Sequence, residues 1–171
     1  MQLQPDQAML LMSALLPQIK AEHKTTLKVI QAAPPDKGDY QPDPRSMNAL
    51  DLVWHIASAD LFFMSLASET PMAGDGKRPE TIRNSTDIAA WYEENFPQGV
   101  EKIAALSGEQ LLKEIPFHQF KMTALGYLQM MVLHTVHHRG QLSAYLRPMG
   151  GKVPAIYGGS ADEPMKDAAA N

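Results

Sequence analysis

Four long segments with apolar side chains spaced three to four residues apart are the feature that most constrains the fold. They cover residues 8–33, 46–69, 87–106 and 123–147, and the stretches between them are rich in Pro, Gly, Asp and Asn. This spacing places apolar side chains on one side of an α-helix, which must then pack against a partner. We find no alternation with a period of two, so we expect no strands. The pattern predicts an all-α four-helix bundle with long interhelical loops and an irregular C-terminal tail.

Proline, glycine and capping residues set the expected helix boundaries. Proline is favourable only in the first turn of a helix, so Pro17 predicts a short leading turn and a main helix that begins near Leu16. Ser46 is the expected N-cap of the second helix, and Pro97 is expected to kink or divide the third. Gly140 lies within the fourth helix at a cost of about 1 kcal/mol relative to Ala, which predicts close approach of another helix or of the tail.

The composition fits one folded domain over residues 1–171, in which the last residues, about 165–171, are expected to be flexible. Hydrophobic residues make up 44% of the chain and charged residues 20%, as is typical of folded soluble proteins. The net charge is −4, from 15 basic and 19 acidic residues, and there is no basic stripe. We therefore expect no nucleic-acid partner.

The absence of cysteine excludes disulfides and thiolate metal ligands and fits a reducing compartment. The amino-terminal stretch MQLQPDQAMLLMSALLPQIK lacks the basic leader of a secretory signal. No stretch has the length of uninterrupted apolar residues that a membrane span needs. We expect a cytoplasmic protein without a membrane partner, in which histidine and carboxylate side chains supply any metal ligands.

Three of the six histidines lie within five positions of the fourth segment, in MVLHTVHHRGQLSAYLR. On a helical wheel of about 100° per residue, His134 and His138 lie about 40° apart beside an apolar arc, whereas His137 points away from it. Two imidazoles at i and i+4 can bind one divalent ion. The zinc-protease motif is absent because Thr135 stands in place of its glutamate base. Six histidines also give such a pair by chance in about one of six sequences like this one, so the spacing alone is weak evidence.

His55 adds a third inward-facing imidazole, because it shares a helix face with the apolar residues Leu52, Ala59, Phe62 and Leu66. A single buried imidazole needs only a hydrogen-bond partner. Three imidazoles on two helices either hydrogen-bond one another or bind a divalent cation, and periodicity leaves both interpretations open. A site with three histidine ligands keeps a position for water or substrate, which is typical of reactive rather than structural sites.

Other residues are expected near this cluster. Asp51, one turn before His55, either orients that imidazole or is a solvated helix acid. His137 is expected behind the site or on the surface. A charged surface face explains Glu22 and His23, and the alternative is that one of the two side chains reaches the cavity. Three further side chains either line a pocket or belong to the core: Tyr127, Met131 and Tyr145.

Three stretches spread over nearly the whole chain are similar to those of a known family: SMNALDLVWHIASAD, HTVHHRGQLSAYLRPMGGKVP and IYGGSADE. On these the chain resembles the DinB/YfiT-like family of metal-dependent enzymes. The resemblance implies a four-helix bundle that holds a divalent metal with three histidines, which map onto His55, His134 and His138. It also implies a homodimer and a bacterial, cytoplasmic origin.

Some members of that family use bacillithiol, mycothiol or glutathione as the nucleophile in S-transfer or isomerisation, with a metal that lowers the pKa of the thiol. Three neutral imidazoles suit zinc, nickel, iron or copper. We therefore expect a metal-dependent thiol S-transferase or a hydrolase that acts on a small electrophilic molecule, with a low-molecular-weight thiol as possible cofactor. The alternatives are a non-catalytic metal-binding or stress-response protein, and a metal-free bundle that acts through its surface.

Overall fold

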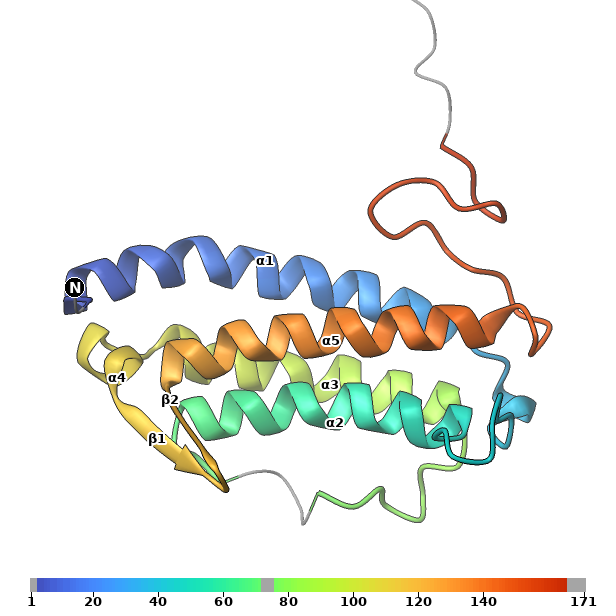
Figure 1. Ribbon diagram of the computed structural model, residues 1–171, viewed down its shortest axis with the longest axis horizontal. Coiled ribbons are helices and arrows are strands. Elements are labelled where there is room, and N and C mark those ends of the chain that lie inside the picture. Colours follow the sequence, from blue (N-terminus) through green and yellow to red (C-terminus); the bar gives the residue numbers. More distant parts are fainter. Residues whose placement is uncertain (1–2, 72–75, 166–171) are drawn as a thin grey trace, which may run out of the picture.

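Four long helices lie side by side in the computed structural model, which describes residues 3–71 and 76–165 (Figure 1). A short helix and a two-stranded hairpin lie at one end of the bundle. This arrangement confirms the predicted four-helix bundle. In chain order the elements are α1 (Pro5–Gln31), a 3-10 turn (Pro35–Lys37), α2 (Ala49–Ala67), α3 (Ser85–Ala104), α4 (Gly108–Leu112), β1 (Glu114–Phe117), β2 (Phe120–Thr123) and α5 (Ala124–Leu146).

The four long helices form a square in which α1 and α2 each pack against both α3 and α5. In Figure 1, α1 and α5 run in one direction and α2 and α3 in the other. Helix α2 therefore ends at the opposite end of the bundle from the start of α3. Because α2 and α5 are antiparallel neighbours, the amino-terminal half of α2 faces the carboxy-terminal half of α5.

Helix α2 is the most apolar of the four. Among the described residues it is the one helix that is long and apolar enough to cross a membrane, and 56% of the relevant window is buried in the bundle. It is not an uninterrupted apolar stretch, because it contains Asp51, His55 and Asp60. Its packing against both α3 and α5 accounts for the composition, because a helix with two apolar faces is what the core of a bundle requires.

Both helix-interior prolines lie in continuous helices, so the predicted break at Pro17 and the predicted division at Pro97 are wrong. Both proline side chains are exposed. The carbonyl groups that lose a hydrogen bond, those of Ser13 and Glu93, also belong to exposed residues, where water can satisfy them.

The predictions made for Ser46 and Gly140 are also wrong. The N-cap of α2 is Asn48 instead of Ser46, and the Asn48 Oδ1 atom accepts a hydrogen bond of 2.8 Å from the Asp51 amide. Gly140 is exposed, and a Cβ added to it would meet nothing within 4 Å. The close approach of the tail occurs instead at Gly151, where a Cβ would lie 2.7 Å from the carbonyl oxygen of Ala32.

The hairpin contradicts the expectation that the chain has no strands. Its two antiparallel strands are four residues each, with Phe117 paired to Phe120 and His118 in the turn at a φ of 51°. The Tyr127 hydroxyl donates a hydrogen bond of 3.0 Å to the carbonyl of Ile115, which attaches the hairpin to α5. One end of the histidine-bearing helix is thus covered by a short sheet.

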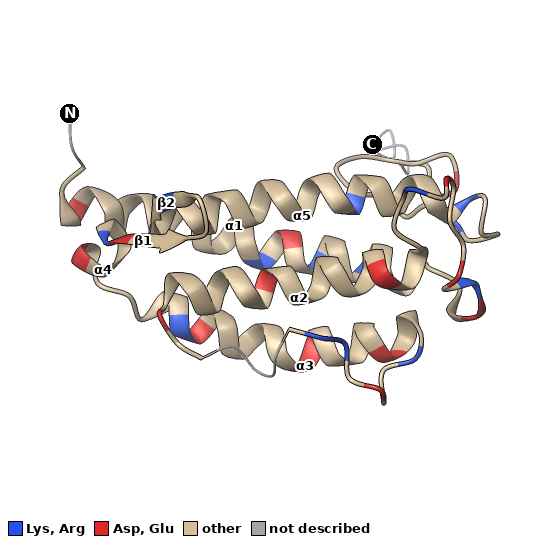
Figure 2. Cartoon of the chain, turned by 60° about the horizontal axis from the view of Figure 1, so that its bottom comes forward, with Lys and Arg blue, Asp and Glu red and all other residues tan. Residues whose placement is uncertain are grey.

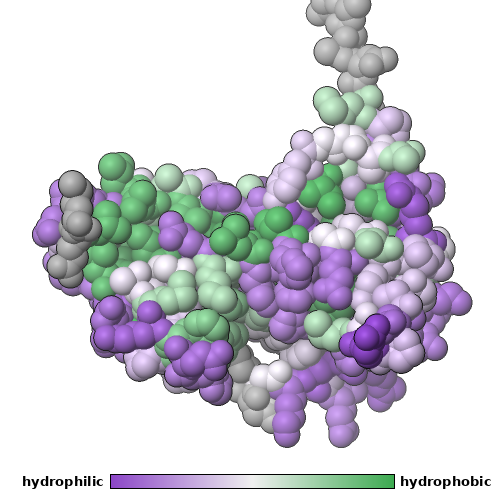
Figure 3. Space-filling view, in the orientation of Figure 1, coloured by the Kyte–Doolittle hydropathy of each residue, from purple (hydrophilic) through white to green (hydrophobic). Residues whose placement is uncertain are grey.

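Charged residues of both signs are interspersed over the face in Figure 2. Figure 3 shows apolar residues over the amino-terminal half of α1. The tail after α5 has no regular structure up to residue 165, as predicted, and residues 166–171 of the stretch expected to be flexible lie outside the described residues. The large apolar side chains that remain exposed are Leu3, Met9, Leu10, Leu11, Met47, Phe120, Leu133, Tyr157 and Met165.

Candidate metal site

Three imidazoles converge between α2 and α5. His55 comes from α2, and His134 and His138 come from successive turns of α5. The Nε2 atom of His55 lies 3.0 Å from Nε2 of His134 and 3.2 Å from Nε2 of His138. One ligand atom from each residue lies within 4.8 Å of the others, and the three side chains are partly buried. This cluster could hold a metal ion.

Burial favours the neutral form of two of these imidazoles, those of His55 and His134. Desolvation, followed by the neighbouring imidazoles, lowers the pKa of His134 to about 4. Desolvation and then the charge of His138 also lower the pKa of His55. A neutral imidazole has one nitrogen lone pair available, which is the form that binds metals.

A chain of hydrogen bonds determines which nitrogen of His138 carries the hydrogen. The carbonyl of Met47 can only accept, so the Tyr145 hydroxyl donates to it (3.3 Å) and accepts from the Gln141 amide nitrogen (3.1 Å). The Gln141 amide oxygen then faces His138 Nδ1 at 3.0 Å and accepts its hydrogen. The Nε2 lone pair of His138 is left directed at His55, which is the orientation found in metal-binding histidines.

Asp51 and His137 do not join this cluster. Asp51 is exposed, and its carboxylate contacts the Asn48 amide nitrogen at 2.8 Å and the Arg78 guanidinium at 3.9 Å. It therefore belongs to the cap of α2. His137 is exposed, with its ring centroid 4.8 Å from that of His138, so it lies on the surface beside the site.

The three side chains that sequence placed in either the pocket or the core are all buried, but they differ in role. The hydroxyl of Tyr127 holds the hairpin, and Met131 is 2% exposed within the core. Tyr145 reaches the cluster indirectly, through Gln141. Gln141 was missed in the sequence, although its position three residues after His138, on the same helix face, is a usable signal.

A buried polar group lies next to the cluster. The hydroxyl groups of Tyr92 on α3 and Thr135 on α5 both donate to the carboxylate of Asp60 on α2. Desolvation raises the pKa of Asp60 to about 6, against the opposing effect of these hydrogen bonds. Because Thr135 directly follows His134, this group fixes the two ligand-bearing helices relative to each other.

A cavity of about 290 Å³ opens beside His55. Helix α2 forms one wall and Phe117 of the hairpin the other. The Phe62 and Phe117 ring centroids are 4.9 Å apart. The lining residues are His55, Ser58, Ala59, Phe62, Gly76 and Phe117.

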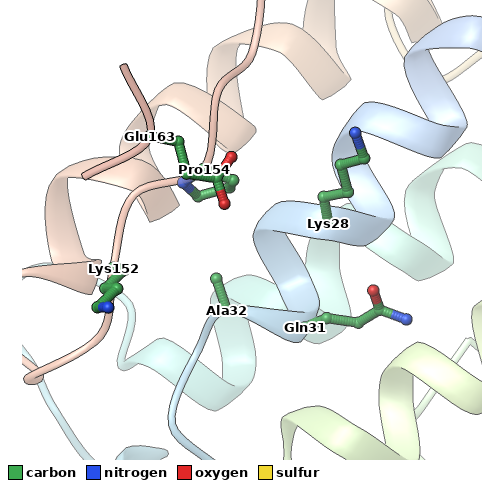
Figure 4. Close-up of a pocket in the computed structure, with 6 residues that line it drawn as sticks. All are labelled: Lys28, Gln31, Ala32, Lys152, Pro154 and Glu163. Atoms are coloured by element: carbon green, nitrogen blue, oxygen red, sulfur yellow. The ribbon is translucent and has the colours of Figure 1, made fainter. Parts of the chain in front are cut away.

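A larger cavity, of about 430 Å³, lies between the end of α1 and the tail (Figure 4). It shares no lining residue with the histidine cluster, and its carboxylate, Glu163, accepts a hydrogen bond of 2.9 Å from the Ala155 amide. The smaller cavity is therefore the one that adjoins the histidine cluster. The larger one is lined by Lys28, Gln31, Ala32, Lys152, Pro154 and Glu163.

Comparisons with known proteins agree with this architecture. The uncharacterized protein YjoA of Bacillus subtilis strain 168 is 32% identical over 119 residues, which are 67% of this chain and 75% of YjoA. The crystal structure of YjoA matches with a TM-score of 0.66 at 28% identity and covers 81% of this chain and 94% of its own. The crystal structure of a DinB-like protein from Bacillus cereus ATCC 10987 matches with a TM-score of 0.74 at 21% identity, over 85% of this chain and 97% of its own, and shows the same fold.

The sequence model of the DinB family matches residues 7–168, almost the full length described. That match includes both helices that carry the histidine cluster. The resemblance noted in the sequence is thereby confirmed, and the chain belongs to the DinB family.

Proposed function

We propose that this protein binds one divalent transition metal ion through His55, His134 and His138 and acts on a small electrophilic molecule, with water or a low-molecular-weight thiol as the nucleophile. The observation that carries the proposal is the convergence of the three Nε2 atoms, with separations of 3.0 and 3.2 Å from His55. A tetrahedral ion with metal–nitrogen bonds of about 2.0–2.1 Å holds its ligands about 3.3 Å apart, so the spacing fits.

A bound ion would supply a Lewis acid that lowers the pKa of water or of a thiol. The chain supplies the rest of the site. Gln141 orients His138, the Asp60 carboxylate holds α2 and α5 in register, and Phe62 and Phe117 give the cavity an aromatic lining. The sequence contains no cysteine, so a thiol nucleophile has to come from solution.

Elemental analysis of the purified protein tests the metal site. We expect one equivalent of a transition metal in the wild type and none in His134→Ala. The matched control is His137→Ala, which changes an exposed histidine of the same helix and should keep the metal. Metal in His134→Ala at the wild-type level would contradict the proposed ligand set.

A panel of thiols and electrophiles tests the reaction. We expect turnover by the metal-loaded wild type and by His137→Ala, and none by His134→Ala. Equal turnover by the wild type and His134→Ala would exclude chemistry at this site. Metal binding without turnover would instead favour the non-catalytic metal-binding protein.

We also propose that the protein forms a homodimer. The consecutive apolar residues Met9, Leu10 and Leu11 of α1 are all exposed, and a contiguous exposed apolar patch is typical of a protein interface (Figure 3). Light scattering after gel filtration should give twice the chain mass for the wild type and a single chain mass for Leu10→Glu. A single chain mass for the wild type would contradict the dimer.

A further inference from the structure

We propose that the cavity beside His55 binds a small, uncharged aromatic or alkyl group, and that Phe62 and Phe117 determine its specificity. This inference rests on the proposed function, because it names the class of molecule that the metal site would act on. His55 lines the cavity and also belongs to the histidine cluster, so a ligand in the cavity lies next to that cluster.

The lining offers no charge to a ligand. Of the described residues that form it, none carries a formal charge. Its one hydroxyl group, that of Ser58, donates its hydrogen to the carbonyl of Trp54 at 2.7 Å. In the metal-free protein, a carboxylate or phosphate placed here would lose part of its hydration without gaining a cationic partner from the described lining residues, which is unfavourable. The cavity therefore selects for neutral groups.

A series of aromatic rings in contact with one another connects the cavity to the histidine cluster. The rings of Phe62 and Phe117 are inclined at 54° with centroids 4.9 Å apart, and both side chains are partly buried. On the inner side, Phe63 lies 5.5 Å from Phe62 and 5.6 Å from the ring of His134. A further ring in the cavity can pack against these faces and edges at the separations that aromatic pairs prefer, about 4.5–7 Å.

The size of the cavity limits the ligand. Its volume of about 290 Å³ is at the lower end of the range of roughly 300–1,000 Å³ for small-molecule sites. A cavity of this size accepts one substituted ring or a short alkyl chain. The structure thus points to a compact hydrophobic electrophile or thiol as the molecule bound beside the metal.

Binding to cobalt-loaded protein tests this class of ligand. Benzyl mercaptan and mercaptosuccinate both carry a thiol, and the change in the cobalt absorption spectrum reports the binding of each. We expect the dissociation constant of benzyl mercaptan to be at least tenfold lower. Equal or tighter binding of the anionic mercaptosuccinate would overturn the inference.

A second experiment uses metal-free protein and needs no metal chemistry. Saturation-transfer NMR should detect binding of benzyl alcohol but not of phenylacetate at the same concentration. Phe117→Ala should abolish the benzyl alcohol signal. Phe120→Ala, which changes the 46% exposed partner of Phe117 on the same hairpin, should leave it unchanged. Equal effects of the two substitutions would overturn the role of Phe117.

Ala59→Phe provides an independent variant, because it fills the cavity from α2 and leaves the hairpin sequence intact. We expect it to keep the circular dichroism spectrum of the wild type and to lose benzyl alcohol binding. Unchanged binding would contradict the location of the site. Failure of the protein to take up cobalt would reject the proposed function, whereas cobalt uptake without preference for the neutral ligand would reject this inference alone.

Discussion

In two of the three clustered histidines, His134 and His138, the surroundings of the nitrogen that faces away from the cluster differ. Nδ1 of His138 donates to Gln141, whereas Nδ1 of His134 is buried and has no hydrogen-bond partner among the described residues. His134 is oriented by packing, with the edge of Phe63 against its ring. Gln141 is therefore the residue that pre-orients the cluster for a ligand.

Replacing Gln141 with Leu should weaken metal binding. The substitution removes the acceptor that keeps the hydrogen of His138 on Nδ1, and loss of such a partner typically costs about 10- to 100-fold in affinity. Competition with a chromogenic chelator at pH 7 measures the change. Gln129→Leu, at an exposed position of the same helix, is the control and should bind as the wild type does. Unchanged affinity in Gln141→Leu would show that the amide has no orienting role.

The histidines could be predicted because their direction depends on local helix periodicity. His55, His134 and His138 share faces with apolar residues, and the antiparallel packing of two helices then brings them together. The role of Gln141 could not be predicted in the same way. That role depends on the carbonyl of Met47, which is far away in the sequence. This carbonyl determines the direction of the hydrogen bonds that run through Tyr145 and Gln141 to His138.

At the level of secondary structure, apolar spacing predicted the four long helices, and single-residue rules misplaced their boundaries. Pro17 and Pro97 are tolerated because both face solvent, which only the packed bundle decides. The hairpin was missed because its strands are too short for alternation to be recognised. Of its apolar side chains only Ile115 is buried, while Phe117 lines a cavity.

A substitution at Gly140 tests whether this glycine of α5 is free of any packing requirement. Because it is exposed and open around its Cβ position, Gly140→Ala should raise the free energy of unfolding by about 0.5–1 kcal/mol, the difference in helix propensity. Urea unfolding of metal-free protein measures it. In the control Gly99→Ala, the new Cβ would lie 2.6 Å from the end of Met64, so no gain is expected. A loss of stability in Gly140→Ala would mean that the glycine is required by its surroundings.

For the whole molecule, Arg139 is the residue that joins separate parts of the chain. Its side chain is 1% exposed and contacts the Glu22 carboxylate at 2.6 Å, the Thr26 hydroxyl at 3.1 Å and the Tyr157 hydroxyl at 2.5 Å. Helix α5 is thereby tied to α1 and to the tail. The prediction that Glu22 belongs to a charged surface face is wrong, because its partner lies in the interior.

Replacing Arg139 with an uncharged residue should lower the stability of the protein substantially. Arg139→Met leaves Glu22 partly buried without its partner and should lower the free energy of unfolding by about 3–5 kcal/mol. Arg147→Met removes an ion pair of 3.0 Å to Asp162 whose arginine side chain is 54% exposed, and should cost at most about 1 kcal/mol. Chemical denaturation of both variants gives the comparison. Equal losses would show that burial does not strengthen the contribution of Arg139.

The pH dependence of stability should reflect the buried imidazoles. Desolvation lowers the pKa of His23 and of His134 to about 4 from an ordinary value of 6.5, so between these values the unfolded chain binds more protons. Stability should therefore rise as the pH rises from 4 to 6.5. Asp60 acts in the opposite direction, because its raised pKa makes its contribution fall as the pH rises from 3.8 to about 6.

Urea unfolding of chelator-treated protein at several pH values tests this balance. Two histidines outweigh one aspartate, so we expect a net rise in stability from acid to neutral pH. His23→Phe keeps the stacking on Phe96 and removes one titrating group. Its stability should depend less steeply on pH than that of the wild type. The same slope in both proteins would show that His23 does not contribute.

The cavity wall and the clustered histidines belong to different elements of the bundle. The histidines are on α2 and α5, within the packed core, whereas Phe117 is on the hairpin that connects α4 to α5. Changes in residues 114–123 can therefore reshape the wall without disturbing the packing that holds the histidines. A bundle of this kind can therefore change which small molecules its cavity admits by exchanging one short connection, while the arrangement of the three histidines is inherited unchanged.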